Sequence, residues 1–292
     1  MSGLITTKGK NISLDRIYNA GTYSEIKYIQ LGMCAKAPII TDTKVFAPIP
    51  TETSGNATID ACDATTGWSA SGDGTGVVLN TTAGDRLEGT GSLNLEATFS
   101  SGVATYYKTL SSFVGTDDYL FIAFYANSLT SLVNTTDTIQ IELGTGGFTN
   151  TNIYDFNYSQ LQTGWNAIVC KIDTPTSTNG TGATIATIDR IRINIKINTD
   201  LADDDLIMDY IHTYPEANTY ITWESGYPTL NETTKTATTR FILNSLQANS
   251  YILREFGVFD DTKAYLYRRD KYTSITKTQY ITLTFDIVDK IN

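Results

Sequence analysis

The chain has 292 residues, 41% of them apolar, which is enough for one large or two medium globular domains. Its formal net charge of −10 would repel phosphate backbones and anionic membranes, so we expect no nucleic-acid or membrane partner. Three cysteines without CxxC spacing (Cys34, Cys62 and Cys170) and one histidine, His212, argue against a disulfide framework and against a zinc site built on these residue types.

The composition predicts an all-β fold, because 18 Tyr and many Thr, Asn, Ile, Gly and Ser residues favour pleated strands and turns over helices. The opening MSGLITTKGKNISL has no basic region followed by a long apolar core. No run of about 18 apolar residues occurs anywhere in the sequence. We therefore expect a protein that is made in the cytoplasm and stays soluble.

Residues 1–55 contain two predicted elements and a connector. A brief helix is expected after Ser13, which can cap it, with Asp15 in the favoured first turn. Residues 23–31 alternate in the manner of a strand. Between residues 37 and 50, three prolines exclude a central strand and predict an extended connector.

From about residue 58 to residue 214, short apolar runs are separated by Gly, Ser and Thr turns, which predicts a β-sandwich of two packed antiparallel sheets. Within 188–197, isoleucines mostly alternate with charged and amide residues, so one face should be buried and the other solvated. The nine expected strands are 76–80, 92–98, 104–109, 119–126, 138–143, 153–157, 165–172, 188–197 and 206–214.

After Pro215 the residue pattern differs from that of 58–214. Further strand-like runs are separated there by polar segments and by a predicted hairpin turn at 260–263. Because the first 55 residues are too few to bury a core alone, we expect 1–55 and 215–292 to form one discontinuous β domain. Residues 56–214 are then a domain inserted into it.

The two ends resemble the small β domain of tailed-phage virion proteins of the tail-fibre, collar and baseplate group. The matching segments are LITTKGKNISLDRIYN, YIQLG and PIITDT at the start, and ITWESGYPTLNETTKTATTRFIL, LREFGVFD and RRDKYTSITKTQYITLTFDIV at the end. The segment LGMCAKAP departs from relatives that are richer in Gly and Thr. The resemblance implies a virion location, other virion proteins as partners, and a homo-oligomer, for which we expect a trimer.

The middle part resembles a carbohydrate-binding-module sandwich of the jelly-roll type, on the segments IDACDATTGW, LEGTGSLNLE, LQTGWNAIVCKI and DDDLIMDYIHTY. The resemblance implies a structural calcium ion held by Asp60, Glu88 and Asp209, since calcium prefers six to eight oxygen ligands. The alternative is that Asp60 and Asp63 are turn residues, Glu88 is solvated and Asp209 only hydrogen-bonds the chain end. The acidic run 203–205 is expected to be a solvated turn.

Four tyrosines are the predicted exposed platform for a sugar ring: Tyr106, Tyr107, Tyr154 and Tyr158. Trp68 and Trp165 each follow a glycine and could also stack on a sugar, but we expect both to fill the core instead.

No local motif selects a catalytic pair of carboxylates or a nucleophile, and no long repeat indicates a solenoid depolymerase, so we expect no enzymatic activity. The hypothesis is a structural phage virion protein that docks through its split β domain and displays an insert able to contact host-surface glycan. The alternative is a stand-alone carbohydrate-binding module of a secreted or cell-surface protein, which the missing secretion signal opposes.

Overall fold

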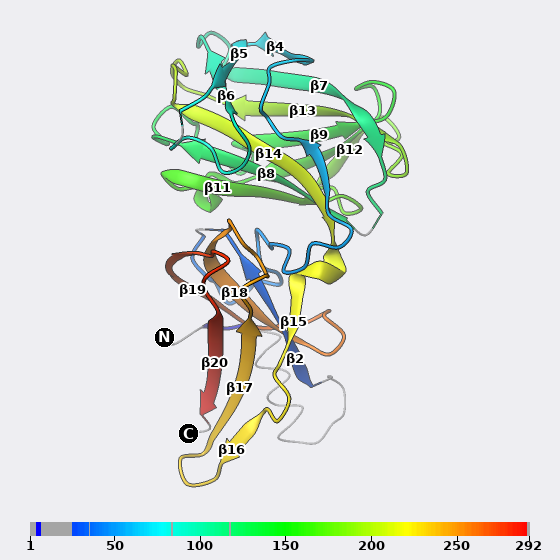
Figure 1. Ribbon diagram of the computed structural model, residues 1–292. Helices are drawn as coiled ribbons and strands as arrows, with labels where there is room; N and C mark the ends of the chain where they lie inside the picture. The colour runs from blue at the N-terminus through cyan, green and yellow to red at the C-terminus, as the bar shows by residue number, and fades with distance from the viewer. Residues whose placement is uncertain (1–3, 7–24, 35, 83, 117, 291–292) are drawn as a thin grey trace. The chain divides into compact units, whose positions relative to one another are not determined.

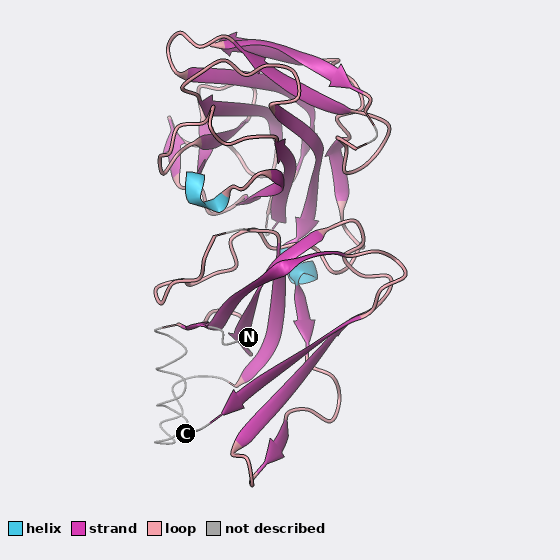
Figure 2. Ribbon diagram, turned by 90° about the vertical axis from the view of Figure 1, so that its left-hand side faces the viewer, coloured by secondary structure: helices cyan, strands magenta, loops and turns pink. Residues whose placement is uncertain are grey.

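The computed structural model describes residues 4–6, 25–34, 36–82, 84–116 and 118–290. The helix expected after Ser13 lies outside them. The described chain consists of antiparallel strands and two short 3-10 helices, η1 (Tyr158–Gln160) and η2 (Glu216–Thr219), which confirms the all-β prediction (Figure 2). No helix in this described part is long and apolar enough to cross a membrane.

The chain divides into two compact units (Figure 1). The first combines both ends of the sequence, Met1–Ser54 and Ala217–Asn292, and the second is the continuous stretch Gly55–Glu216. Below they are called the split unit and the sandwich unit.

The split unit contains a five-stranded sheet in the order β1-β19-β18-β2-β15 and a three-stranded sheet in the order β16-β17-β20. Strand β2 comes from the first end of the chain and lies between two strands of the second end, so neither end completes this sheet alone. The strands are β1 (Leu4–Ile5), β2 (Ile26–Gly32), β15 (Tyr220–Thr222), β16 (Thr229–Asn231), β17 (Thr236–Leu243), β18 (Ile252–Asp260), β19 (Leu266–Thr276) and β20 (Leu283–Lys290).

The sandwich unit has two sheets, one in the order β12-β10-β9-β13-β7-β4 and one in the order β11-β8-β14-β6-β5, with β3 added to β14. The strands are β3 (Ala57–Asp60), β4 (Trp68–Gly72), β5 (Gly74–Asn80), β6 (Ser92–Ala97), β7 (Val103–Phe113), β8 (Asp118–Ala126), β9 (Ile139–Gly144), β10 (Thr151–Phe156), β11 (Gly164–Lys171), β12 (Ser177–Asn179), β13 (Ile188–Lys196) and β14 (Leu206–Pro215). All nine strands expected here are present.

The core of the sandwich unit lies between its two sheets and is formed by alternate residues of each strand. In β13, for example, Ile191, Ile193 and Ile195 are fully buried and pack against the opposite sheet. The residues between them point to the other side of the sheet, which therefore carries a polar surface.

Candidate functional site

The candidate site is the outer surface of the sheet β12-β10-β9-β13-β7-β4, which we call the polar face. Alternation along β13 places Arg192, Asn194 and Lys196 there, because the isoleucines between them occupy the core. Strands β7 and β9 flank β13 and contribute the side chains that face these three residues.

Strand register aligns one row of polar side chains across four strands. Asn194 pairs with Thr105 on one side and with Gln140 on the other, and Gln140 pairs in turn with Asp155. The Thr105 hydroxyl donates to Asn194 Oδ1 (2.9 Å), Asn194 Nδ2 donates to Gln140 Oε1 (3.2 Å), and Gln140 Nε2 donates to Asp155 Oδ1 (2.9 Å). This chain of hydrogen bonds fixes the orientation of both amides.

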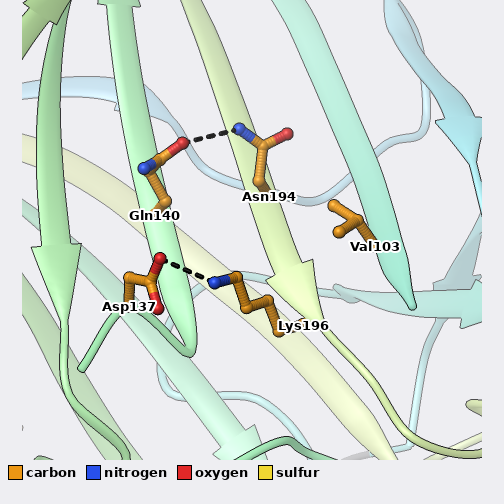
Figure 3. A pocket seen from close by; sticks show the side chains of 5 residues that line it. All are labelled: Val103, Asp137, Gln140, Asn194 and Lys196. Atoms are coloured by element: carbon orange, nitrogen blue, oxygen red, sulfur yellow. Dashed lines mark hydrogen bonds and ion pairs between the residues drawn. The ribbon is translucent and has the colours of Figure 1, made fainter. Parts of the chain in front are cut away.

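A pocket of about 330 Å³ opens beside this row (Figure 3). Gln140 and Asn194 lie on one side of it, and Asp137 and Lys196 on another, joined by an ion pair of 2.7 Å. Val103 supplies an apolar wall. The pocket therefore combines hydrogen-bonding groups of both kinds with one apolar surface.

The neighbouring row adds an aromatic element to the polar face. Arg192 pairs with Tyr107 and Glu142 across the strands, and its guanidinium lies 3.9 Å from the centroid of the Phe148 ring. Phe148 meets Tyr107 edge to face, with ring centroids 6.1 Å apart. The two rings are half-buried, so each keeps some surface accessible to a ligand.

Phe148 reaches the polar face through the glycine-rich loop between β9 and β10. A Cβ atom on Gly144 would lie 2.2 Å from the carbonyl oxygen of Gly147, and Gly146 has a φ of 68°. Both positions therefore require glycine for this tight path.

Two ion pairs lie on the polar face, Arg192 with Glu142 and Lys196 with Asp137, while the Asp155 carboxylate accepts from Gln140 Nε2. Glu142 accepts from Arg192 (3.2 Å) and from Asn194 Nδ2 (2.7 Å), and Lys196 pairs with Asp137. A charged ligand that bound at one of these two ion pairs would compete with it, whereas an uncharged ligand rich in hydroxyl groups would not.

The four predicted platform tyrosines do not lie together. Tyr107 is on the polar face, as a platform requires. Tyr106 and Tyr154 belong to the core, with exposed fractions of 0% and 4%, so their prediction as exposed platform residues is wrong. Their hydroxyls donate to the carbonyls of Glu96 and Ile172, and burial raises the pKa of both phenols.

Tyr158 is half-buried in η1, packs against the core, and donates to the Leu129 carbonyl at 3.4 Å. No ring contact joins it to the Tyr107 and Phe148 pair among the described residues.

The three predicted calcium ligands do not converge. Asp60 accepts from the Lys108 ammonium (2.7 Å) and from Trp68 Nε1 (3.0 Å), while Glu88 has an exposed side chain. Within the described residues, no three His, Cys, Asp or Glu side chains form a group that could hold a metal ion. As placed here, these residues do not fit a calcium site.

Asp209 is nevertheless unusual, because its carboxylate is fully buried. Oδ2 accepts from the backbone amides of Leu87 (2.6 Å) and Glu88 (3.0 Å), whereas no described residue donates to Oδ1. Burial raises the pKa of Asp209 to about 6, despite those two amides.

The two tryptophans differ in position. Trp68 packs partly against the sandwich core. Trp165 is half-buried and pairs with Tyr125 across the strands β11 and β8, with ring centroids 5.5 Å apart.

Sequence reasoning missed Gln140, Asn194 and Phe148. The alternation of 188–197 placed Asn194 on a solvated face, but only strand pairing shows that Gln140 lies opposite to it. The run GTGGF in the loop after β9 was the available signal for Phe148.

No protein-family model matches the sequence, and no curated protein matches it. Among solved structures, the chain is similar to a family 11 carbohydrate-binding module from Clostridium thermocellum in complex with a β-1,3-1,4-mixed-linked tetrasaccharide. Identity is 12% and the TM-score 0.40, over 56% of this chain and 98% of that chain.

A second similar structure is the enzymatically active domain of tailspike protein 4 from bacteriophage CBA120, with 14% identity and a TM-score of 0.35 over 56% of this chain and 21% of that chain. A third is the C-terminal family 6 carbohydrate-binding module of LamC from Zobellia galactanivorans, with 13% identity and a TM-score of 0.29 over 55% and 98%. Similarities of this size carry no argument about function.

Proposed function

We propose that the sandwich unit is a non-catalytic carbohydrate-binding domain whose polar face holds a neutral glycan. The observation that carries this proposal is the hydrogen-bonded row formed by Thr105, Asn194, Gln140 and Asp155, beside the aromatic pair of Tyr107 and Phe148. A sugar ring presents hydroxyl groups at its edge and C–H groups on its faces. It therefore matches a surface that combines oriented amides with aromatic rings.

Preorganisation supports a binding role over simple solvation. The two amides are held by side chains on both sides, so a ligand would not have to order them on binding. The paired charges of Arg192 with Glu142 and of Lys196 with Asp137 favour an uncharged ligand.

A glycan array, followed by titration calorimetry with the best neutral oligosaccharide, tests this proposal. We expect Asn194→Ala and Tyr107→Ala each to weaken binding by at least tenfold, which corresponds to about 1.4 kcal/mol. Tyr280→Ala is the matched control, since Tyr280 lies in the split unit and is 87% exposed. Equal loss in all three variants, or no neutral glycan bound at millimolar concentration, would contradict the proposal.

For the split unit we propose docking on a phage particle, with the sandwich unit displayed to contact host-surface glycan. The supporting observation is that the segments resembling virion proteins pair directly. Leu31, Gln30 and Ile29 of β2 lie opposite residues 256–258 of β18, within YIQLG and LREFGVFD. The proposal includes virion proteins as partners and a homotrimer.

Mass spectrometry of purified particles and analytical ultracentrifugation test the virion proposal. We expect the chain in the particles and a trimer in solution. A monomer that is absent from particles would contradict docking and leave the alternative, a carbohydrate-binding module of a secreted or cell-surface protein.

A further inference from the structure

Lys277 lies just after β19 in the split unit and is fully buried, with an exposed fraction of 0%. Its ammonium group donates to Asn249 Oδ1 (3.1 Å) and to the backbone carbonyl of Thr278 (2.9 Å). None of the ion pairs among the described residues involves Lys277. Keeping a buried amine charged costs free energy when its hydrogen-bond partners are neutral oxygens. Burial accordingly lowers the pKa of Lys277, which favours the neutral, nucleophilic amine.

The backbone holds Asn249 against this amine at a conformational cost. Its two neighbours, Ala248 and Ser250, have φ angles of 51° and 73°, in the left-handed region that non-glycine residues rarely adopt. Two backbone hydrogen bonds fix the segment, from Ser250 to the Lys277 carbonyl and from Lys277 to the Tyr251 carbonyl, both 2.9 Å. They continue the β18 and β19 pairing, which ends with Ile252 opposite Thr276.

We propose that Lys277 and Asn249 form an intramolecular isopeptide bond. The amine and the side-chain amide are already in hydrogen-bond contact, on two segments whose register is fixed by the strand pairing. The bond would convert a buried ionisable group into a neutral amide. It would also tie the loop before β18 to the segment after β19.

The reaction needs no co-reactant. The lone pair of neutral Lys277 Nζ attacks Asn249 Cγ, and the new Nζ–Cγ bond forms as the Cγ–Nδ2 bond breaks. One proton passes from Nζ to Nδ2, which leaves as ammonia. The Thr278 carbonyl holds the amine, and Asn249 Nδ2 donates to the Ser245 carbonyl (3.0 Å), which orients the amide.

Intact-mass spectrometry of the purified, denatured full chain tests the proposal, before and after incubation at roughly pH 9, where more lysine is deprotonated. We expect a mass lower than the sequence mass by one ammonia. Protease digestion should yield a branched peptide that joins the segment containing Asn249 to the segment containing Lys277. The full sequence mass after incubation would overturn the proposal.

A succinimide at Asn249 would also release one ammonia, so the variant Lys277→Met is the necessary control. Methionine is also unbranched and flexible, is one atom shorter than lysine, and has no amine. We expect Lys277→Met and Asn249→Ala to have their full sequence masses. Loss of ammonia that persists in Lys277→Met would overturn the proposal, because the loss would then not require the lysine. The mass of the wild-type chain tests the proposal even where a variant fails to fold.

Discussion

Arg269 is an arginine buried entirely within the split unit. Its guanidinium contacts the carboxylates of Glu255 (2.6 Å) and Asp42 (2.8 Å), and also lies over the Phe46 ring. The other oxygen of Glu255 accepts from the backbone amides of Phe46 (3.2 Å) and Ala47 (3.1 Å). This ionic cluster joins β18 and β19 to the proline-rich connector, a segment with little regular structure of its own.

We expect Arg269→Met to destabilise the protein by about 3–5 kcal/mol, because it leaves the buried Glu255 carboxylate without its counter-ion. Arg240→Met is the matched control. Arg240 pairs with Asp286, but their side chains are 35% and 41% exposed. Its loss should cost much less than the loss of Arg269, because a solvent-exposed ion pair contributes little to stability. Urea unfolding of both variants measures the difference, and equal costs would show that the buried cluster contributes no more than a surface pair.

His212, on β14, is stacked on the Tyr210 ring at 4.4 Å between centroids and also contacts Phe121 at 4.8 Å. Burial lowers its pKa to about 3, against an ordinary value of about 6.5. The unfolded chain therefore takes up a proton that the folded chain does not, and stability falls as the pH drops from about 6.5 towards 3.

Between pH 7 and pH 5, we expect the wild type to lose about 2 kcal/mol of unfolding free energy relative to His212→Phe. The comparison with the variant matters because Asp209, with its pKa raised to about 6, acts in the opposite direction over part of this range. Urea titrations of both proteins at the two pH values measure the effect. Parallel pH profiles would mean that His212 is protonated in the folded state.

Alternate residues of strand β13 serve different purposes, because those on one side form the core and those on the other side form the polar face. Ile193 is fully buried in the core, while its neighbour Asn194 lies on the polar face. Ile193→Ala should cost about 2–5 kcal/mol and leave the polar face chemically intact. Asn194→Ala should cost about 1 kcal/mol and abolish most glycan binding. Urea unfolding and calorimetry on both variants check this, and an Asn194→Ala variant that is destabilised as much as Ile193→Ala would argue for a structural role of Asn194 instead.

The same alternation explains how much of the sandwich the sequence could predict. Strands with regular apolar periods, such as β13, were predictable, whereas β4 and β12 carry few buried side chains and have no such pattern. In β7 the alternation of apolar and polar residues is interrupted at Lys108. This lysine lies on the same side of the strand as Tyr106, where it donates to Asp60 at the edge of the core. Without a regular apolar alternation in β7, the sequence alone could not decide which of Tyr106 and Tyr107 faces solvent.

The candidate site was less predictable than the fold, because it depends on pairing between distant segments. Asn194 and Gln140 are 54 positions apart in sequence and meet only through the register of β13 with β9. The calcium site that the resemblance implied likewise requires carboxylates from distant segments to meet. Asp60, one of its three expected ligands, instead pairs with Lys108.

At the scale of the whole molecule, the junction between the units determines how separable they are. In the split unit the two chain segments meet next to the insertion point. Thr51 donates through its amide and its hydroxyl to the Asn218 carbonyl, both at 2.7 Å, and Asn218 Nδ2 donates to the Ser54 carbonyl (2.6 Å). In the sandwich unit, a Cβ atom on Gly55 would lie 3.1 Å from Pro215. The two ends of each unit at this junction are therefore close together.

Close ends allow each unit to be closed by a short linker, since an insertion costs little when it does not stretch the parent fold. We expect Gly55–Glu216 to unfold cooperatively by itself and to keep the glycan affinity of the full chain, because its core and polar face come entirely from within this range.

We expect the split unit to fold when a short Gly-Ser linker replaces the insert, because β2 still pairs with β18. Thermal melts followed by circular dichroism, with calorimetry on the first fragment, measure both outcomes. A fragment that melts without cooperativity would mean that the two units depend on each other for folding, and a folded Gly55–Glu216 without affinity would place the glycan site elsewhere.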